Sequence, residues 1–259
     1  MQTRRQTVGI IGLGAFGRFM AKHLAPWFTL KGWDRVRPGP GELAAAGAEA
    51  VEVAGLEQVA ACDIVVFAIP LDGLAEVAAA AAKHMRPGAL VLDVTSVKMR
   101  PVEILSRLPK RVDVLATHPL FGPQSGKNGI AGLRIAMCPV RISLKRYVQV
   151  CDFLTEKLSL LCLKTTPENH DREMARVQAM THFMSRALKK IGLQPSAMST
   201  RAYEKLQEFS SIVLSDSWDL FLTIQNGNPF AEEIRHSLLQ ELEALETQLA
   251  PSASLVNAG

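Results

Sequence analysis

A single histidine stands at the start of an unusual loop, ATHPLFGPQSGKNG, at positions 116–129. This residue, His118, follows an apolar stretch, and the rigid PLFGP segment after it would fix the direction of its ring. An imidazole titrates near neutral pH and can accept a proton from a hydroxyl group. Ser96, in DVTSVK at 93–98, could share a hydrogen bond with the same hydroxyl. The simpler alternatives are a histidine that only ends a strand and a serine that caps a helix.

A second group of residues has the spacing of a dinucleotide site. The segment VGIIGLGAFG, at 8–17, fits the pattern G-x-G-x-x-G directly after a predicted strand and at the start of a predicted helix. The glycines allow a tight turn and a close approach of the backbone to a pyrophosphate, whose charge is favoured at a helix N-terminus. The predicted contacts are Gly12, Gly14, Ala15, Phe16 and Gly17.

The next predicted strand ends at an acidic residue, Asp34, which lies 22 residues after Gly12. This is close to the spacing of the carboxylate that binds the adenosine ribose, and a carboxylate there would repel a 2′-phosphate. The pattern therefore favours NAD as the cofactor. Arg35 and Arg37 leave NADP open, because either guanidinium could bind that phosphate, or could lie over the adenine or in solvent.

Short apolar runs alternate with helical stretches over the first two thirds of the chain. Such runs are typical of a parallel sheet buried on both faces, with helices as crossovers. The eight predicted strands are TVGII, FTLKGW, AVEV, DIVVFAI, ALVLDV, DVLATH, RIAMCPV and LLCLKTT. The predicted fold is α/β, with an N-terminal Rossmann-type, mostly parallel sheet. Ligands of such a sheet collect at the carboxyl ends of its strands, where Ile69, Pro70, Ser96 and His118 would lie.

After Thr166 the strand signals stop and helical signals replace them. PENHDREMARVQAMTHFMSRALKKIG, at 167–192, predicts one long helix with Pro167 in its first turn and Gly192 just past its end. Further helices are expected at about 199–225 and 229–249, on either side of NGNP. We therefore expect a dinucleotide-binding domain at 1–166 and an all-helical substrate and dimerisation domain at 167–259. The apolar face of the second domain would complete its core against another subunit, which predicts a homodimer.

The composition narrows the class of protein. Hydrophobic residues make up 48% of the chain, enough to bury a core, but the longest apolar runs fall far short of the roughly 20 residues that cross a bilayer. With 29 basic and 25 acidic residues and 6% aromatics, the chain lacks the basic stripe of a nucleic-acid-binding protein. The first residues leave no room for a signal peptide, so a cytoplasmic protein is expected. The four cysteines lack metal-site spacing, and we expect buried thiols and no metal.

Two polar residues of the long helix, Gln178 and His182, are four positions apart and therefore on one face. Met174 shares that face, so a partly buried polar pair on a core stripe is one interpretation. The other is a ligand site, because a helix of the second domain would cover the carboxyl edge of the sheet and form a cleft with it.

Together these segments resemble the prephenate and arogenate dehydrogenases, a family of tyrosine biosynthesis. The resemblance covers nearly the whole chain, through GIIGLGAFG, DVTSVK, THPLFGPQSGKNG, ENHDREMARVQAMTHF and SDSWDLF. The histidine loop and the helix with HD, Q and TH are its specific parts. GPQSGKNG and SDSWDLF are most similar to the arogenate dehydrogenases of plants and related bacteria. Neither a chorismate mutase extension nor a regulatory amino-acid-binding domain is visible, so the resemblance implies a minimal catalytic form.

The resemblance implies an oxidative decarboxylation, in which hydride passes from the carbinol carbon of a cyclohexadienol to a nicotinamide while the ring carboxylate leaves as carbon dioxide. His118 would be the hydrogen-bond acceptor or general base for the ring hydroxyl, with Ser96 beside it. The residues that would contact substrate are Ser125, Gln178 and His182, which would orient it, and Lys98 and Lys127, which could meet its two carboxylates. A solvated surface position is the alternative for Lys127.

Arogenate carries an ammonium group where prephenate carries a keto group, so a site for arogenate gains from a nearby carboxylate. Asp216, in SDSWDLF, is the candidate, with an ordinary exposed acid or a helix cap as the alternative. The resemblance therefore favours arogenate over prephenate. Many bacterial members use a C-terminal arginine for substrate, and the sequence leaves open whether Arg186, Arg201, Arg235 or none of them has that role.

Some features depart from the family or fit other proteins. Where plant members have Ser-Arg after the second strand and use NADP, this chain has Asp34-Arg35. A hydroxyacid or imine reductase of similar build would rely on a lysine in the helical domain. A dinucleotide-sensing module that dimerises through its helices would bind the cofactor without turnover.

Overall fold

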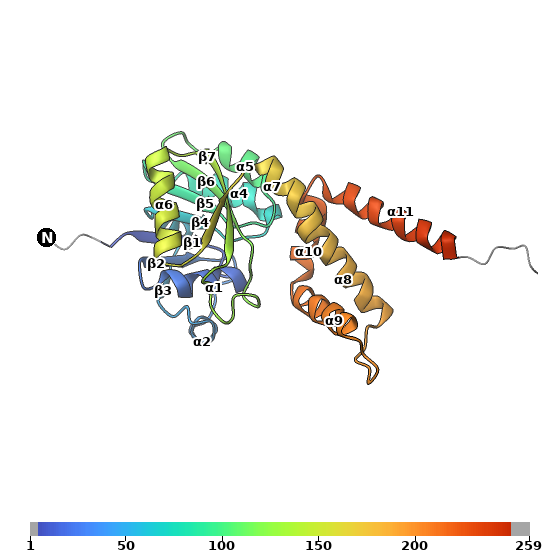
Figure 1. Ribbon diagram of the computed structural model, residues 1–259. Coiled ribbons are helices and arrows are strands. Elements are labelled where there is room, and N and C mark those ends of the chain that lie inside the picture. Colours follow the sequence, from blue (N-terminus) through green and yellow to red (C-terminus); the bar gives the residue numbers. More distant parts are fainter. Residues whose placement is uncertain (1–4, 250–259) are drawn as a thin grey trace, which may run out of the picture.

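The structure is a computed structural model that describes residues 5–249, and its central element is an eight-stranded sheet (Figure 1). The strand order is β3-β2-β1-β4-β5-β6-β7-β8, and the β6–β7 pair alone is antiparallel. All eight predicted strands are confirmed. Their bounds are β1 Thr7–Ile11, β2 Thr29–Trp33, β3 Val51–Val53, β4 Ile64–Phe67, β5 Leu90–Asp93, β6 Asp113–Pro119, β7 Arg134–Arg141 and β8 Leu161–Lys164.

Helices cover both faces of this sheet, which explains the nearly continuous apolar strands. Buried side chains of α3, α4 and α5 pack on one face, and side chains of α1, α2 and α6 pack on the other. Alternate residues of β4 separate the two cores, since Val65 and Phe67 belong to the first and Val66 to the second. The helix bounds are α1 Ala15–Leu24, α2 Pro40–Ala45, α3 Leu56–Ala60, α4 Leu71–Ala82, α5 Met99–Ser106 and α6 Leu144–Glu156.

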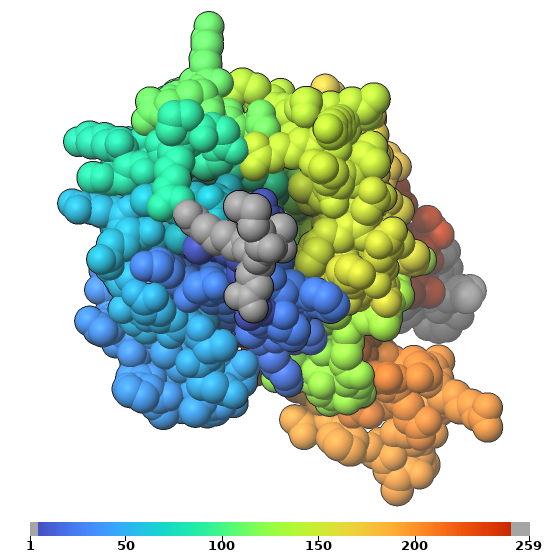
Figure 2. Space-filling view, turned by 90° about the vertical axis from the view of Figure 1, so that its left-hand side faces the viewer, coloured from blue at the N-terminus to red at the C-terminus, as the bar shows by residue number. Residues whose placement is uncertain are grey.

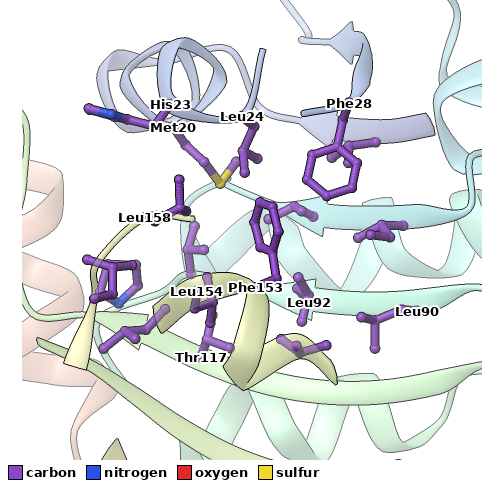
Figure 3. Close-up of a pocket in the computed structure, with 18 of the residues that line it drawn as sticks. Met20, His23, Leu24, Phe28, Leu90, Leu92, Thr117, Phe153, Leu154 and Leu158 are labelled. Carbon is purple, nitrogen blue, oxygen red and sulfur yellow. The ribbon is translucent and has the colours of Figure 1, made fainter. Parts of the chain in front are cut away.

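An apolar cavity of about 250 Å³ lies between α1 and α6, over β4 and β5 (Figure 3). Its lining includes Met20 and Leu24 of α1, Leu92 of β5 and Phe153 of α6. A carboxylate or phosphate needs charged or hydrogen-bonding partners, and this lining supplies few. The cavity is therefore a poor match for an anionic ligand.

Beyond Lys164 the described chain is helical, and its helices form a lobe beside the sheet (Figure 1). In the side view, the orange part of this lobe projects below the sheet part (Figure 2). The helices are α7 Pro167–Met174, the π-helical turn η1 Ala175–Ala179, α8 Met180–Ile191, α9 Arg201–Leu214, α10 Trp218–Gly227 and α11 Ala231–Leu249. No helix among residues 5–249 combines the length and the apolar composition that crossing a membrane requires.

Two expectations about these helices need correction. The predicted helix at 167–192 is continuous, but a π-helical turn interrupts its α-helical geometry at 175–179. The predicted helix at 199–225 is wrong, because the chain breaks at residues 215–217 and the Ser217 hydroxyl caps α10 by accepting from the Leu220 N–H. Serine favours helix N-caps over helix interiors for this reason.

One side chain, Asp171 of α7, fastens the helical lobe to the sheet part. Its carboxylate accepts the backbone N–H groups of Lys98 at 2.7 Å and Met99 at 2.9 Å, at the start of α5. Its own carbonyl accepts from the Asn228 side chain at 2.7 Å. These bonds satisfy helix-end donors that would otherwise lack partners, so the junction has a defined geometry.

Candidate functional site

The glycine turn between β1 and α1 has the shape of an anion site. Gly12 adopts φ +106°, and a Cβ on this residue would lie 2.3 Å from the Ala68 carbonyl oxygen. A Cβ on Gly17 would lie 1.9 Å from the Gly12 carbonyl oxygen, so both positions require glycine. Gly14 instead faces open space. Because no side chain caps α1 and its first turn holds no acidic residue, its N–H groups are available to a phosphate.

Asp34 follows β2 and lies beside this turn. One carboxylate oxygen accepts the Leu13 N–H at 2.6 Å, and the other accepts the Val36 N–H at 3.2 Å. A carboxylate has about four acceptor positions, so lone pairs remain for a ribose hydroxyl. Arg35 and Arg37 are exposed in the loop that begins at Asp34. The loop therefore holds both a carboxylate that could accept a hydrogen bond from the ribose and guanidinium groups that could donate to a 2′-phosphate.

The carboxyl end of β6 carries His118, which is buried, with 4% of its surface exposed. Its Nδ1 lies 2.9 Å from Nε2 of His170 on α7, and His170 Nδ1 lies 2.8 Å from an Asp171 carboxylate oxygen. Burial, with the neighbouring His170 and Lys98, holds the pKa of His118 well below its usual value. The imidazole is therefore neutral at physiological pH and can accept a proton or a hydrogen bond.

The sequence reasoning did not assign a role to His170 or Asp171. Both residues stand in the HD pair of the long helix, and this pair was the available signal. Their contact with His118 depends on tertiary structure, because 52 residues separate the two histidines.

Lys98 does not lie where the sequence placed it. Its side chain is completely buried, and its ammonium group forms an ion pair with Asp93 and donates to the Thr117 carbonyl at 2.6 Å. It also lies 3.2 Å from the Thr95 hydroxyl. The expectation that it meets a substrate carboxylate is corrected accordingly: the ammonium fixes the ends of β5 and β6 beneath His118.

Ser96 is half-buried in the loop after β5. Its alternative role as the cap of α5 does not occur, because Asp171 accepts the N–H groups at that helix end. Its hydroxyl forms no hydrogen bond within residues 5–249, so it is available to a ligand at the strand ends.

Ser125 and Lys127 lie on a loop that packs against α1. The Ser125 hydroxyl accepts the Gly122 N–H at 2.9 Å and so closes the loop on itself. Gly126 lies against the Phe19 ring. Lys127 is exposed and lines an open depression with Arg18 and Lys22 of α1. The substrate contacts expected of both residues stay predictions.

A second polar group gathers on the helical lobe, around His182. Its Nε2 lies 3.6 Å from a carboxylate oxygen of Asp216, which stands in the break between α9 and α10. Burial and the nearby Arg186 lower the pKa of His182 to about 4, so the ring is neutral and this contact is no ion pair at physiological pH. Burial raises the pKa of Asp216. Gln178 stands in the π-helical turn and His182 lies four positions further, in α8, so the expectation that the two share one face stays a prediction.

The polar group around His182 contains buried atoms that have no hydrogen-bond partner in the described chain. Within the described chain, no hydrogen bond reaches Gln178 Oε1, His182 Nδ1, Ser185 Oγ or Arg186 Nε. Buried polar atoms are rarely left unpaired in folded proteins unless a ligand or water satisfies them. The π-helical turn at 175–179 contains Gln178 and lies between His170 and His182 along the helix, and such turns are frequent at functional sites.

The structure also separates the three candidate arginines. Arg186 donates to the Asp216 carbonyl at 2.8 Å, and its guanidinium lies 5.4 Å from the ring centres of both Trp218 and Phe221. Arg201 is exposed at the first position of α9, and Arg235 donates to the backbone and side chain of Gln225. Arg186 is thus the candidate that lies beside His182 and Asp216.

Comparisons with known proteins match both parts of the chain. A family model described as "Prephenate dehydrogenase, nucleotide-binding domain" matches residues 32–137, and "TYRAAT1-like, C-terminal domain" matches residues 187–257. Arogenate dehydrogenase 2 of Arabidopsis thaliana, a chloroplastic protein, is 35% identical over 172 residues, which are 64% of this chain and 48% of that protein. The chain therefore spans about half the length of this relative.

Solved structures share the fold over almost the whole chain. Synechocystis arogenate dehydrogenase has a TM-score of 0.67 and 19% identity, covering 95% of this chain and 94% of the other. Prephenate dehydrogenase from A. aeolicus, in complex with hydroxyphenyl propionate and NAD+, has a TM-score of 0.71 and 22% identity, covering 96% and 93%.

Proposed function

Because the chain belongs to the prephenate and arogenate dehydrogenase family, we propose that it oxidatively decarboxylates L-arogenate to L-tyrosine with a nicotinamide cofactor. The observation that carries this proposal is the position of His118. It is a buried, neutral imidazole at the carboxyl edge of the sheet, the edge that also carries the glycine turn. Prephenate, or both cyclohexadienols, are the alternative substrates.

The residues of the turn fit the proposed cofactor. The open space at Gly14 and the free N–H groups of Ala15 and Phe16 would hold the pyrophosphate, and Asp34 would accept from the ribose. Ile69 and Pro70 follow β4, with Ile69 beside Gly12 and Pro70 at the N-cap of α4, and they would form one wall of the site. A nicotinamide bound there supplies the hydride acceptor. We propose NAD, because the Asp34 carboxylate would repel a 2′-phosphate.

His118 would accept a hydrogen bond from the ring hydroxyl of the substrate. As hydride leaves the carbinol carbon, this oxygen becomes more acidic, and a base there stabilises the developing charge. The electron pair of the breaking carbon–carboxylate bond enters the ring, which becomes aromatic, and the hydroxyl stays on the product as a phenol. No net proton is released. Ser96 would donate to the same oxygen.

Replacing Asp34 with serine is expected to change the cofactor preference. Loss of the charged acceptor should lower kcat/KM with NAD by roughly 10- to 100-fold, since a hydrogen bond to a charged group contributes about 1.5–3 kcal/mol. The ratio of NADP to NAD activity should rise. The matched control is Arg35→Gln, which should lower the activity with NADP and leave that with NAD. An unchanged ratio in Asp34→Ser would contradict the ribose assignment.

The group around His182 would hold the polar end of the substrate. Arg186 would bind a carboxylate, because its buried Nε has no partner in the described chain, while its Nη2 donates to the Asp216 carbonyl and so holds the guanidinium in place. Gln178 and His182 would orient the substrate through atoms that are also unpaired. The Asp216 carboxylate would meet the ammonium group that arogenate has and prephenate lacks.

Replacing Asp216 with asparagine tests the substrate preference. It removes the negative charge and keeps the size of the side chain, so kcat/KM for arogenate should fall by about 10-fold or more while that for prephenate holds or rises. Asp219, an exposed acid one turn further, provides the control variant Asp219→Asn. Equal losses of kcat/KM with both substrates would show that Asp216 does not bind the ammonium group.

We also propose a homodimer formed through the helical lobe. Exposed apolar side chains recur along α11 at Leu239, Leu242, Leu245 and Leu249, and this helix extends away from the rest of the molecule (Figure 1). Leu242→Glu is expected to halve the mass measured by light scattering. The control Leu144→Glu changes a leucine on α6 that is even more exposed, and it should leave the mass unchanged. A wild-type monomer at micromolar concentration would contradict the dimer.

The direct test of function follows reduced cofactor by absorbance in four mixtures, arogenate or prephenate with NAD or NADP. We expect turnover with arogenate and NAD. Turnover with prephenate instead would keep the family chemistry and change the substrate. Cofactor binding without turnover in all four mixtures would support a dinucleotide-sensing module and overturn the proposal.

A further inference from the structure

We propose that His170 and Asp171 are positioning residues that together fix the tautomer of His118, and that His170 accepts a proton from His118 during the reaction. The inference rests on the proposed function for the identity of the proton donor, but the tautomer is a property of the free protein. It arises from a chain of two hydrogen bonds, from His118 through His170 to Asp171, that crosses the junction between the sheet and the helical lobe.

The partners of Asp171 determine the direction of both bonds. Its carboxylate oxygens accept N–H groups from the start of α5, so this side chain acts as an acceptor. His170 Nδ1 must then carry the proton that it shares with Asp171. In the neutral ring, Nε2 of His170 is consequently an acceptor, and His118 Nδ1 must donate to it. This leaves a bare lone pair on His118 Nε2, as a base for the substrate hydroxyl requires.

The charged neighbours explain why a proton would move from His118 to His170. The groups around the two rings are the buried Lys98–Asp93 ion pair beneath them, the Cys138 thiol on β7, and Asp171. Burial raises the pKa of Cys138 to about 12, so this thiol is neutral. A positive charge on His118 would lie in a buried site near the Lys98 ammonium group. The same charge on His170 would lie next to the Asp171 carboxylate, 2.8 Å away.

The transfer is balanced at each atom. As the substrate hydroxyl gives its proton to His118 Nε2, the proton on His118 Nδ1 moves to His170 Nε2. His170 then has protons on both nitrogens and forms an ion pair with Asp171. When the ring becomes aromatic, the reverse movement returns the proton to the phenol oxygen. Neither histidine is consumed, and no further reactant is needed.

The first test reads the tautomer without any substrate. The full chain is labelled with 15N-histidine, and long-range proton–nitrogen spectra distinguish protonated from bare ring nitrogens. The chain has six histidines, which single His→Gln variants assign. At neutral pH we expect a proton on Nδ1 and a bare Nε2 in His118. A proton on His118 Nε2 would overturn the inference, even for an enzyme that turns over arogenate.

The second test compares two replacements of His170 that fold around the same space. In His170→Gln, the amide oxygen stands near the former Nε2 and can still accept from His118 Nδ1, but it cannot take a proton. In His170→Asn, the amide stands near the former Nδ1 and the contact with His118 is lost. We expect His118 to keep its single tautomer in the glutamine variant and to become a mixture of tautomers in the asparagine variant.

The kinetics of these variants separate a relay from simple packing. Both should lower kcat by about 10- to 100-fold, the usual effect of removing a residue that orients a reactive group, with little change in KM. In His170→Gln, the positive charge must stay on His118, so the acidic limb of the kcat profile should move to lower pH. A packing role predicts lower stability and an unmoved limb. An unmoved limb with wild-type kcat would overturn the relay.

Discussion

Replacing His118 with asparagine is expected to lower kcat by about 10²- to 10⁴-fold, the usual contribution of a general acid or base. The asparagine amide can occupy the place of Nδ1 and donate to His170, so the hydrogen bond beneath the site is kept. No atom replaces Nε2, and the substrate hydroxyl loses its acceptor. Affinity for the cofactor should not change, because the glycine turn and Asp34 are untouched. Steady-state kinetics and cofactor titration measure these two quantities separately.

The control for this variant is His84→Asn. His84 is exposed beyond the end of α4 and has no place in either polar group, so its replacement should leave kcat and cofactor affinity unchanged. A His118→Asn enzyme that keeps most of its kcat would contradict the role of the imidazole. It would then favour a reductase that uses a lysine.

The strands and the glycine turn could be predicted from sequence because each depends on local information. The strands are short runs of β-branched and aliphatic residues, several of which end at or just before Asp, Gly or Pro, and all eight appear in the sheet. The turn needs glycine at positions 12 and 17 for steric reasons that the motif already encodes. His118 could be placed at the sheet edge because its strand could be placed.

The remaining parts depend on contacts that the sequence does not reveal. His170 and Asp171 are adjacent polar residues in the first turns of a helix, a pattern equally typical of a solvated surface. Their burial follows from the docking of α7 on the start of α5. The break between α9 and α10 rests on one serine cap, which competes with helical propensity on both sides. The π-helical turn has no sequence signal that we can identify.

The position of Lys98 is the clearest case of a contact that the sequence does not reveal. Lysine is almost never fully buried unless its charge is paired, and the sequence does not show that pairing. The sequence places it after the fifth strand, among residues that face ligands in sheets of this kind. Its partner Asp93 is five residues away, and the two meet because the loop between them folds back over the strand ends. The Thr117 carbonyl then joins the group from β6. The ammonium group therefore holds together the ends of β5 and β6 next to His118.

Replacing Lys98 with methionine is expected to lower the free energy of unfolding by about 3–5 kcal/mol, the usual cost of leaving one partner of a buried ion pair without the other. Methionine nearly matches the lysine stem in volume, so the loss reflects the uncompensated Asp93 carboxylate, one of whose oxygens already lacks a partner within the described residues. Urea denaturation measures the change. The control Lys83→Met alters an exposed lysine and should stay within about 0.5 kcal/mol of wild type.

A double variant decides whether charge is the cause. Asp93→Asn in the Lys98→Met background removes the buried negative charge while the amide oxygen can still accept from the Thr95 hydroxyl, which lies 2.5 Å from the carboxylate. The double variant should therefore be more stable than Lys98→Met alone, although one more residue has changed. If the double variant is less stable than the wild type by the sum of the losses measured for Lys98→Met and Asp93→Asn alone, the two residues are not coupled. In that case Lys98 would contribute through packing and its bond to the Thr117 carbonyl, and the end of β6 would depend on that bond for its position.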